Sequence, residues 1–205
     1  MRWVVVGGQS RSVGKTAVVC GLLAALDDRP WTAVKITQFG HGICSRSGHA
    51  CDCACEDGEW ALSEERNHAG RKDTARYLRA GARRVWWLRT RLGALAQALP
   101  ALESQLGAAD WVLFESNSVV ALRRPELYLT LLDPAIADFK QSARALLPRA
   151  DARLVVTADP VTPASADDAP TLAGQGDAAP VFAVAPPAYL TPAVVAWARR
   201  RLAAG

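Results

Sequence analysis

The sequence predicts a three-layer α/β/α fold around a mainly parallel sheet of about seven strands. Three observations lead to this prediction. Short apolar runs typical of buried strands alternate along the chain with longer helical patterns. The first run, residues 3–6, passes through a Gly/Ser-rich turn into an apolar helical pattern that reaches Leu26. Half of the 205 residues are hydrophobic, enough for a sizeable core in a single domain, 1–205.

The composition argues against several classes of protein. No apolar run approaches the roughly 18 residues that span a bilayer, so we expect no membrane partner. The chain starts directly with a strand, so we expect no targeting peptide and a cytoplasmic location. A net charge of +4 is too mild to indicate a nucleic-acid partner. The oligomeric state stays open, with a homodimer among the options.

Positive charge is concentrated between Arg71 and Arg91. Eight Lys or Arg residues stand there against a single acid, Asp73. A solvated helix face explains this as well as a site for a phosphorylated or carboxylated substrate does.

The turn after the first strand has the composition of a phosphate-binding loop. It ends in Gly14-Lys15-Thr16 at the start of a helix, whose N-terminus attracts anions. The Lys15 ammonium can reach terminal phosphates, and the Thr16 hydroxyl can ligate Mg²⁺. The common Walker pattern has four residues between its glycines, whereas five separate Gly8 from Gly14 here, and Gln9 takes the first glycine's place. A Gly-rich turn with a chance lysine is the simpler alternative. The residues expected to bind nucleotide are Gly8, Gln9, Ser10, Arg11, Ser12, Val13, Gly14, Lys15, Thr16 and Ala17.

Two stretches resemble known families. The loop from Gly8 to Thr16 resembles that of dethiobiotin synthetases and cobyrinic acid a,c-diamide synthases, which share the longer spacing and end in Val-Gly-Lys-Thr. The segment 73–82, Asp-Thr-Ala-Arg followed by Ala-Gly-Ala, resembles a stretch of the molybdopterin-guanine dinucleotide biosynthesis protein B family. The resemblance implies a P-loop NTPase of cofactor metabolism, either an NTP hydrolase or an ATP-dependent synthetase (ligase). It covers residues 1 to about 120 in pieces.

Lys35 stands in an otherwise apolar run, 31–37, that is expected to be the second strand. Burying an ammonium is costly unless it is paired, and open α/β folds bind ligands at the carboxyl ends of their strands. We therefore expect Lys35 to face an anion; a solvent-facing lysine on an edge strand is the alternative. In dethiobiotin synthetases the lysine at this place faces substrate and phosphate, so the resemblance implies a catalytic role. The other residues expected near the substrate are Ser116, Asn117 and Ser118.

Thr16, Glu115 and Asp73 are the candidates for Mg²⁺ coordination. Glu115 ends the apolar run 111–115, where the P-loop class places its metal-binding carboxylate; a helix cap is the alternative. The related families usually have Glu-Gly there, so Ser116 leaves the identity of the substrate open. Asp73 either ligates or orients the Mg²⁺ shell, or caps the helix that follows it.

The nucleotide base is expected near the end of a later strand, 154–157. Thr157, Ala158 and Asp159 lie there, and Pro186 belongs to the same expected site. The sequence contains no Asn-Lys-x-Asp guanine motif, which favours ATP over GTP.

Residues 39–67 show little periodicity and are expected to form an inserted functional loop, with a short helix opening at 63–66. The loop concentrates cysteine and histidine. A zinc ion or an iron–sulfur cluster is the favoured explanation, since thiolates at this density bind metal more often than they pair in a cytosolic protein. Redox-active thiols, or thiols without a role, are the alternatives. The expected ligands are Cys44, Cys51, Cys53 and Cys55, with His41 or His49 as a replacement.

Two functions of different class follow. The first is an Mg²⁺-dependent enzyme that uses ATP on a small anionic substrate. The second is a metallochaperone-type NTPase with a protein partner, because nickel-delivery GTPases pair a related loop with Cys/His metal sites. The fifth cysteine, Cys20, lies on the expected first helix and is expected to be a residue of the protein core.

Overall fold

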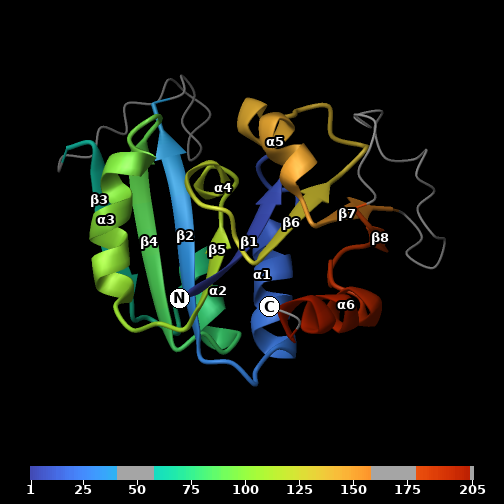
Figure 1. Ribbon diagram of the computed structural model, residues 1–205, viewed down its shortest axis with the longest axis horizontal. Coiled ribbons are helices and arrows are strands. Elements are labelled where there is room, and N and C mark those ends of the chain that lie inside the picture. The colour runs from blue at the N-terminus through green and yellow to red at the C-terminus, as the bar shows by residue number, and fades with distance from the viewer. Residues whose placement is uncertain (41–57, 158–178, 204–205) are drawn as a thin grey trace.

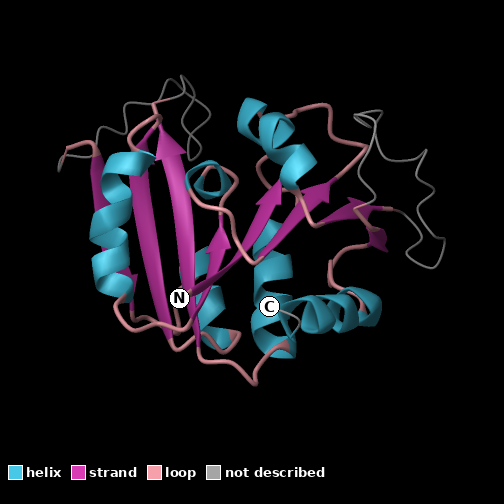
Figure 2. Cartoon of the chain, in the orientation of Figure 1, coloured by secondary structure: helices cyan, strands magenta, loops and turns pink. Residues whose placement is uncertain are grey.

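The computed structural model describes residues 1–40, 58–157 and 179–203, which build one sheet with helices on both faces (Figure 2). The strand order is β3-β4-β2-β5-β1-β6-β7-β8, and every neighbouring pair is parallel except β3 and β4. The predicted α/β class is confirmed, with eight strands instead of about seven. The strands are β1 (Arg2–Gly8), β2 (Trp31–Phe39), β3 (Trp60–Glu65), β4 (Arg84–Arg91), β5 (Trp111–Glu115), β6 (Leu127–Leu132), β7 (Ala152–Val156) and β8 (Val181–Val184).

Two groups of helices cover the sheet and complete the three layers (Figure 1). One core cluster joins the sheet to α1, α2 and α6, and a second joins it to α3, α4 and α5. The helices are α1 (Lys15–Ala25), α2 (Asp73–Arg79), α3 (Leu95–Leu106), α4 (Val119–Leu122), α5 (Gln141–Leu146) and α6 (Pro192–Ala203). None of the helices in these described ranges is both long and apolar enough to cross a membrane.

The central strand β1 shows why the sequence reads as a continuous apolar run. Val4 and Val6 pack on the α1 side, whereas Trp3 and Val5 pack on the α3 side, and all four are fully buried. A parallel strand covered on both faces needs apolar residues at successive positions. This burial on both faces stabilises β1. It thereby fixes the position at which the following loop begins.

The segment after β2 departs from the sequence prediction. Residues 60–65 form the edge strand β3, antiparallel to β4, so the helix expected at 63–66 is wrong. Ala61 is buried, and Trp60 and Leu62 pack against the α3-side core. Pairing with β4 decides the structure here, because three apolar residues in isolation do not distinguish a strand from a helix. β4 continues to Arg91, and α3 begins after it at Leu95.

The topology places the end of β1 at a switch point of the sheet. From β1 the chain passes through α1 to β2, which lies beyond β5, while β6 pairs with the other side of β1 and leads to α5 on the opposite face. Open α/β folds bind ligands outside the carboxyl ends of the strands at such a point. The Gly/Ser-rich loop follows β1 at this place.

Candidate functional site

The loop between β1 and α1 has the backbone of an anion-binding nest. Ser12 and Gly14 have φ values of 60° and 110°, in the left-handed region, and Val13 lies between them. Alternation of this kind turns successive N–H groups toward one point. A side chain on Gly14 would also place its Cβ 2.6 Å from the ring of Tyr189, so both backbone and space require glycine there.

Gln9, which stands where the common pattern has its first glycine, makes specific contacts with a distant segment. Its side chain is 2% exposed and is held by the chain that follows β6. Nε2 donates to the carbonyl of Ile136 at 2.5 Å, and Oε1 accepts from the N–H of Asp133 at 2.9 Å. The Gln9 carbonyl also accepts from the N–H of Lys140 at 2.9 Å. Gln9 thus fastens the loop after β1 to residues 133–140, and a glycine in its place could make only the backbone bond to Lys140.

The side chain of Lys15 folds back over the loop. Its Nζ donates to the carbonyl of Ser10 at 2.5 Å. Burial lowers the pKa of Lys15 to about 8, and nearby Lys140 and Lys35 act in the same direction while Glu115 opposes them. An anion bound beside this buried ammonium would favour its charged form.

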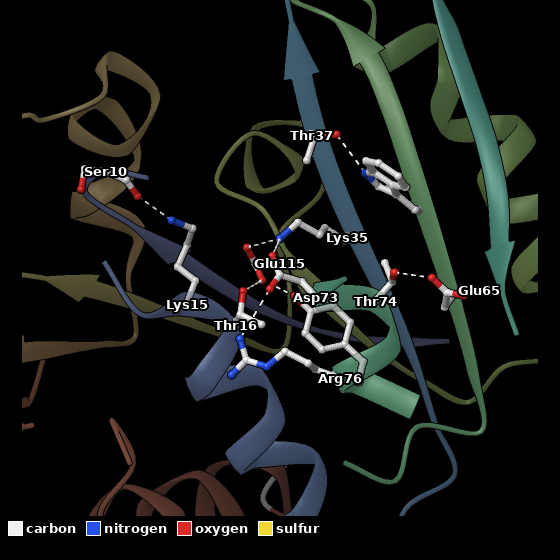
Figure 3. Close-up of polar contacts among 12 residues, drawn as sticks. Ser10, Lys15, Thr16, Lys35, Thr37, Glu65, Asp73, Thr74, Arg76 and Glu115 are labelled. Carbon is white, nitrogen blue, oxygen red and sulfur yellow. Dashed lines mark hydrogen bonds and ion pairs between the residues drawn. The ribbon is translucent and has the colours of Figure 1, made fainter. Parts of the chain in front are cut away.

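Glu115 is the centre of the polar network (Figure 3). It ends β5, is 7% exposed and lies in register with Lys35 on β2. Its Oε2 accepts from the Thr16 hydroxyl at 2.8 Å, and its Oε1 lies 3.1 Å from Lys35 Nζ. The hydroxyl of Tyr77 also donates to Oε2. Two strands and two helices thus bring one carboxylate, one ammonium and two hydroxyls together.

Lys35 and Asp73 form the second half of the network. β2 lies between β4 and β5, so the alternative of an edge strand is excluded. Lys35 Nζ lies 2.5 Å from Asp73 Oδ2, and its side chain is 15% exposed. Burial favours the neutral amine, but Glu115 and Asp73 together outweigh it and raise the pKa of Lys35.

The Asp73 side chain does not cap its helix. α2 begins at Asp73, Lys72 occupies the N-cap position, and no side chain makes a capping hydrogen bond there. Burial opposes ionisation of Asp73, but the hydrogen bond and the charge of Lys35 prevail and lower the pKa of its carboxyl.

The three polar residues after Glu115 have different surroundings. Asn117 holds the end of β1: its Oδ1 accepts from the N–H of Gly8 at 2.8 Å and its Nδ2 donates to the Gly8 carbonyl at 2.9 Å. Ser118 donates to Gln38 Oε1 at 2.7 Å. Ser116 is 8% exposed, and its hydroxyl accepts from the N–H of Val119. Asn117 thereby positions the phosphate loop itself.

Three residues at the site escaped sequence analysis. Tyr77 is buried, and burial together with Glu115 raises its pKa well above the ordinary value, so it stays a neutral donor. Its place four residues after Asp73 puts both on one helix face, which is a signal that the sequence contained. Lys140 and Tyr189 carried no such signal, because residues 133–140 and the turn before α6 approach the loop only through the tertiary fold.

Several expected residues lie outside this network. Ala158, Asp159, His41, His49 and the four clustered cysteines fall outside the described residues. In the ranges that are described, no group of three or more His, Cys, Asp or Glu could hold a metal ion. Thr157 donates its N–H to Val184 at the end of β8, and Pro186 is exposed in the following turn. Cys20 is partly buried against the α1-side core, as expected.

Comparison with known proteins adds one structural likeness. No protein-family model and no curated protein matches the sequence. Among solved structures, HypB from Helicobacter pylori in complex with nickel is similar at 14% identity and a TM-score of 0.46, covering 98% of this chain and 86% of that chain. A likeness of this degree does not extend the nickel of HypB to this protein.

Proposed function

We propose that this protein is an Mg²⁺-dependent P-loop NTPase that transfers or hydrolyses the terminal phosphate of ATP. The observation that supports the proposal most strongly is the contact of Thr16 and Lys35 with the same carboxylate, Glu115, at 2.8 and 3.1 Å. The hydroxyl that follows the loop lysine and an acid at the end of the neighbouring strand are the two protein oxygens that P-loop enzymes use around Mg²⁺.

The chemistry of these donors fits magnesium. Mg²⁺ prefers oxygen ligands and is usually held by one or two carboxylates plus substrate phosphates. Thr16 and Glu115 would hold the ion. Asp73 would not contact the ion but would hold the ammonium of Lys35 beside it. When bound, the ion would neutralise charge on the β- and γ-phosphates.

The remaining residues would position charge. Lys15 and the loop N–H groups would bind the phosphates, and Lys35 would face the γ-phosphate from β2. Asp73 and Tyr77 would hold the Lys35 ammonium and the Glu115 carboxylate in place. Phosphoryl transfer depends almost entirely on positioning and charge neutralisation, so these fixed groups supply what the reaction requires.

The substrate is proposed to be a small anion of cofactor metabolism. The mixture of cations and carboxylates around Lys35 suits the carboxylate or phosphate of a small molecule. A synthetase would transfer the γ-phosphate to such a carboxylate and release nucleoside diphosphate. An amine would then displace inorganic phosphate from the acyl phosphate to form an amide or a ring. Hydrolysis alone would use water in place of that acceptor.

Calorimetric titration of nucleotides in the presence of Mg²⁺ tests the proposal. We expect ATP to bind wild-type protein more tightly than GTP, and Lys15→Ala to abolish binding without unfolding the chain. Arg124→Gln serves as the control. This exposed cation lies just before β6, at the amino ends of the parallel strands, whereas the proposed site lies at their carboxyl ends. ATP affinity that is equal in wild type and Lys15→Ala would remove the proposed site.

The metallochaperone alternative depends on Cys44, Cys51, Cys53 and Cys55, all outside the described residues. Such a protein would show metal affinity that changes with the bound nucleotide, and it would need a protein partner. A synthetase would keep its metal while it turns over a small molecule. The described geometry is compatible with both alternatives, because an enzyme and a metallochaperone-type NTPase each need phosphate and Mg²⁺ chemistry.

A further inference from the structure

The row of side chains that contains the catalytic residues continues across the sheet. Register pairs Glu115 on β5 with Lys35 on β2, and Lys35 with Trp87 on β4. One row nearer the carboxyl ends, Thr37 pairs with Arg89. Paired residues and residues two apart along a strand project from the same face, so all five share the face covered by α1 and α2.

Trp87 is held in a fixed orientation. Its indole Nε1–H donates to the hydroxyl of Thr37 at 3.0 Å. Two cations lie over its ring: Arg89 Cζ is 4.8 Å from the centroid and Lys72 Nζ is 5.4 Å from it. The ring therefore gathers two positive charges beside Lys35.

Arg89 has unused hydrogen-bonding capacity. Among the described residues it makes no ion pair and no side-chain hydrogen bond, and its Nε is buried without a partner. Arg91, two residues later, differs because its guanidinium lies 3.2 Å from Glu59. A guanidinium stacked on a ring uses its face and leaves its N–H edge available to a planar anion.

Lys72, just before α2, is exposed and lies near the carboxylate of Glu65, which already accepts other hydrogen bonds. Glu65 accepts hydrogen bonds from the N–H of Asn67 at 3.0 Å and from the Thr74 hydroxyl at 2.7 Å. These bonds, with a contribution from Lys72, lower the pKa of Glu65. Positive charge thus remains in excess around Trp87.

We propose that Lys72, Trp87 and Arg89 form an anion-binding subsite for the substrate, next to the phosphate site. The subsite rests on the proposed function and holds the carboxylate or phosphate end of a small molecule whose reacting end lies against Lys35. A strand spacing of about 4.8 Å and a rise of about 3.3 Å per residue separate the Cα atoms of Lys35 and Arg89 by roughly 8 Å, so one small molecule can touch both side chains.

The first test fills the phosphate loop and then titrates the subsite. Protein saturated with Mg²⁺ and the β,γ-imido analogue of ATP is titrated by calorimetry with inorganic phosphate and, separately, with glutarate. We expect binding at one site, weakened about tenfold or more by Arg89→Gln and by Lys72→Gln. Arg91→Gln, the matched control, should stay within about twofold of wild type, because that arginine is already paired. The tighter of the two probes identifies a phosphate or a carboxylate on the substrate.

A second pair of variants tests the role of the aromatic ring. Trp87→Leu removes no charge, yet it should weaken probe binding because Arg89 loses its platform, and Arg89→Lys should bind more tightly than Arg89→Gln. Equal affinity of wild type and Arg89→Gln, or no binding of either probe at millimolar concentration, would overturn the subsite.

The Lys15→Ala variant separates this proposal from the proposed function. Titrated without nucleotide, it should bind the probe as tightly as the saturated wild type does if the subsite is real. Loss of nucleotide binding in that variant tests the NTPase proposal alone, whereas the effect of Arg89→Gln tests the subsite alone.

Discussion

The hydroxyl of Thr16 donates a hydrogen bond to Oε2 of Glu115 at 2.8 Å, across 99 positions of sequence. Thr16 lies in the first turn of α1 and Glu115 ends β5, and parallel pairing of β5 with β1 brings them together. The same carboxylate contacts Lys35 from the strand on its other side. A single buried acid therefore connects the loop proposed to bind phosphate with the lysine proposed to face the substrate.

Replacing Glu115 by glutamine should separate binding from chemistry. The amide keeps the size of the side chain but loses the charge proposed to hold Mg²⁺, so we expect nucleotide affinity within a few-fold of wild type. Phosphate release or transfer should fall roughly a hundredfold, about 2.7 kcal/mol of transition-state stabilisation. Steady-state release of phosphate at saturating Mg²⁺ measures the effect. Glu103→Gln on the exposed side of α3 is the control, and a Glu115→Gln variant as active as wild type would leave the carboxylate a purely structural role.

Lys15 should destabilise the nucleotide-free protein at neutral pH. Its pKa is about 8 in the folded chain and has the ordinary value of 10.5 when unfolded, so the unfolded chain binds more protons between these values. Stability contributed by this group therefore rises with pH through that window. We expect Lys15→Met to raise the free energy of unfolding at pH 7, with a gain that shrinks from pH 8 to pH 10.5. Denaturant unfolding at several pH values measures it.

Lys35→Met should have the opposite sign at pH 7. The folded pKa of Lys35 is raised, so its charge contributes stability that is fully present below the unfolded pKa and is lost only as pH rises through the folded value. Its removal leaves Glu115 and Asp73 without their shared cation. Denaturant unfolding at pH 7 should therefore show a loss for Lys35→Met beside the gain for Lys15→Met; the same sign for both would contradict the charge distribution described here.

Gln9→Gly, which restores the glycine of the common pattern, should destabilise the protein. It removes the bonds to Ile136 and Asp133 and leaves a carbonyl and an N–H of these half-buried residues without their partner, a loss of about 1–3 kcal/mol. Urea unfolding measures this loss. Gln9→Glu keeps the length but sets an oxygen against the carbonyls of Ile136 and Asp138, so it should cost stability as well. A fully stable Gln9→Glu would show that the Nε2 contacts contribute little.

The cysteine-rich segment should bind one metal ion or cluster. We expect elemental analysis of purified protein to find stoichiometric zinc, or iron and sulfide after purification without oxygen. Cys51→Ser/Cys53→Ser should lose the metal, because thiolates are the expected ligands. Cys20→Ala is the matched control and should keep the metal, since Cys20 belongs to α1 and packs against the core. A disulfide between any two of the four clustered cysteines would contradict the prediction.

The sequence alone determined the fold class and the centre of the site. Apolar runs at residues 3–6 and 111–115 predicted buried parallel strands, because a strand covered on both faces must be apolar throughout. Gly14-Lys15-Thr16, Lys35 and Glu115 stood out because charged or hydroxyl groups at the ends of such strands need a partner. These patterns are local in the chain, so they can be recognised without knowledge of the fold.

Only the tertiary structure decided how the other residues act. β3 forms because it pairs with the edge of β4. The three apolar residues 60–62 do not by themselves predict that pairing. Asp73 turned out to pair with Lys35 rather than to cap its helix, and Asn117 to hold Gly8. In the sequence, Gln9 is only a departure from the Walker pattern. The structure shows that its side chain bonds to residues 133–140. Such roles depend on contacts between distant segments, which composition and spacing along one chain do not encode.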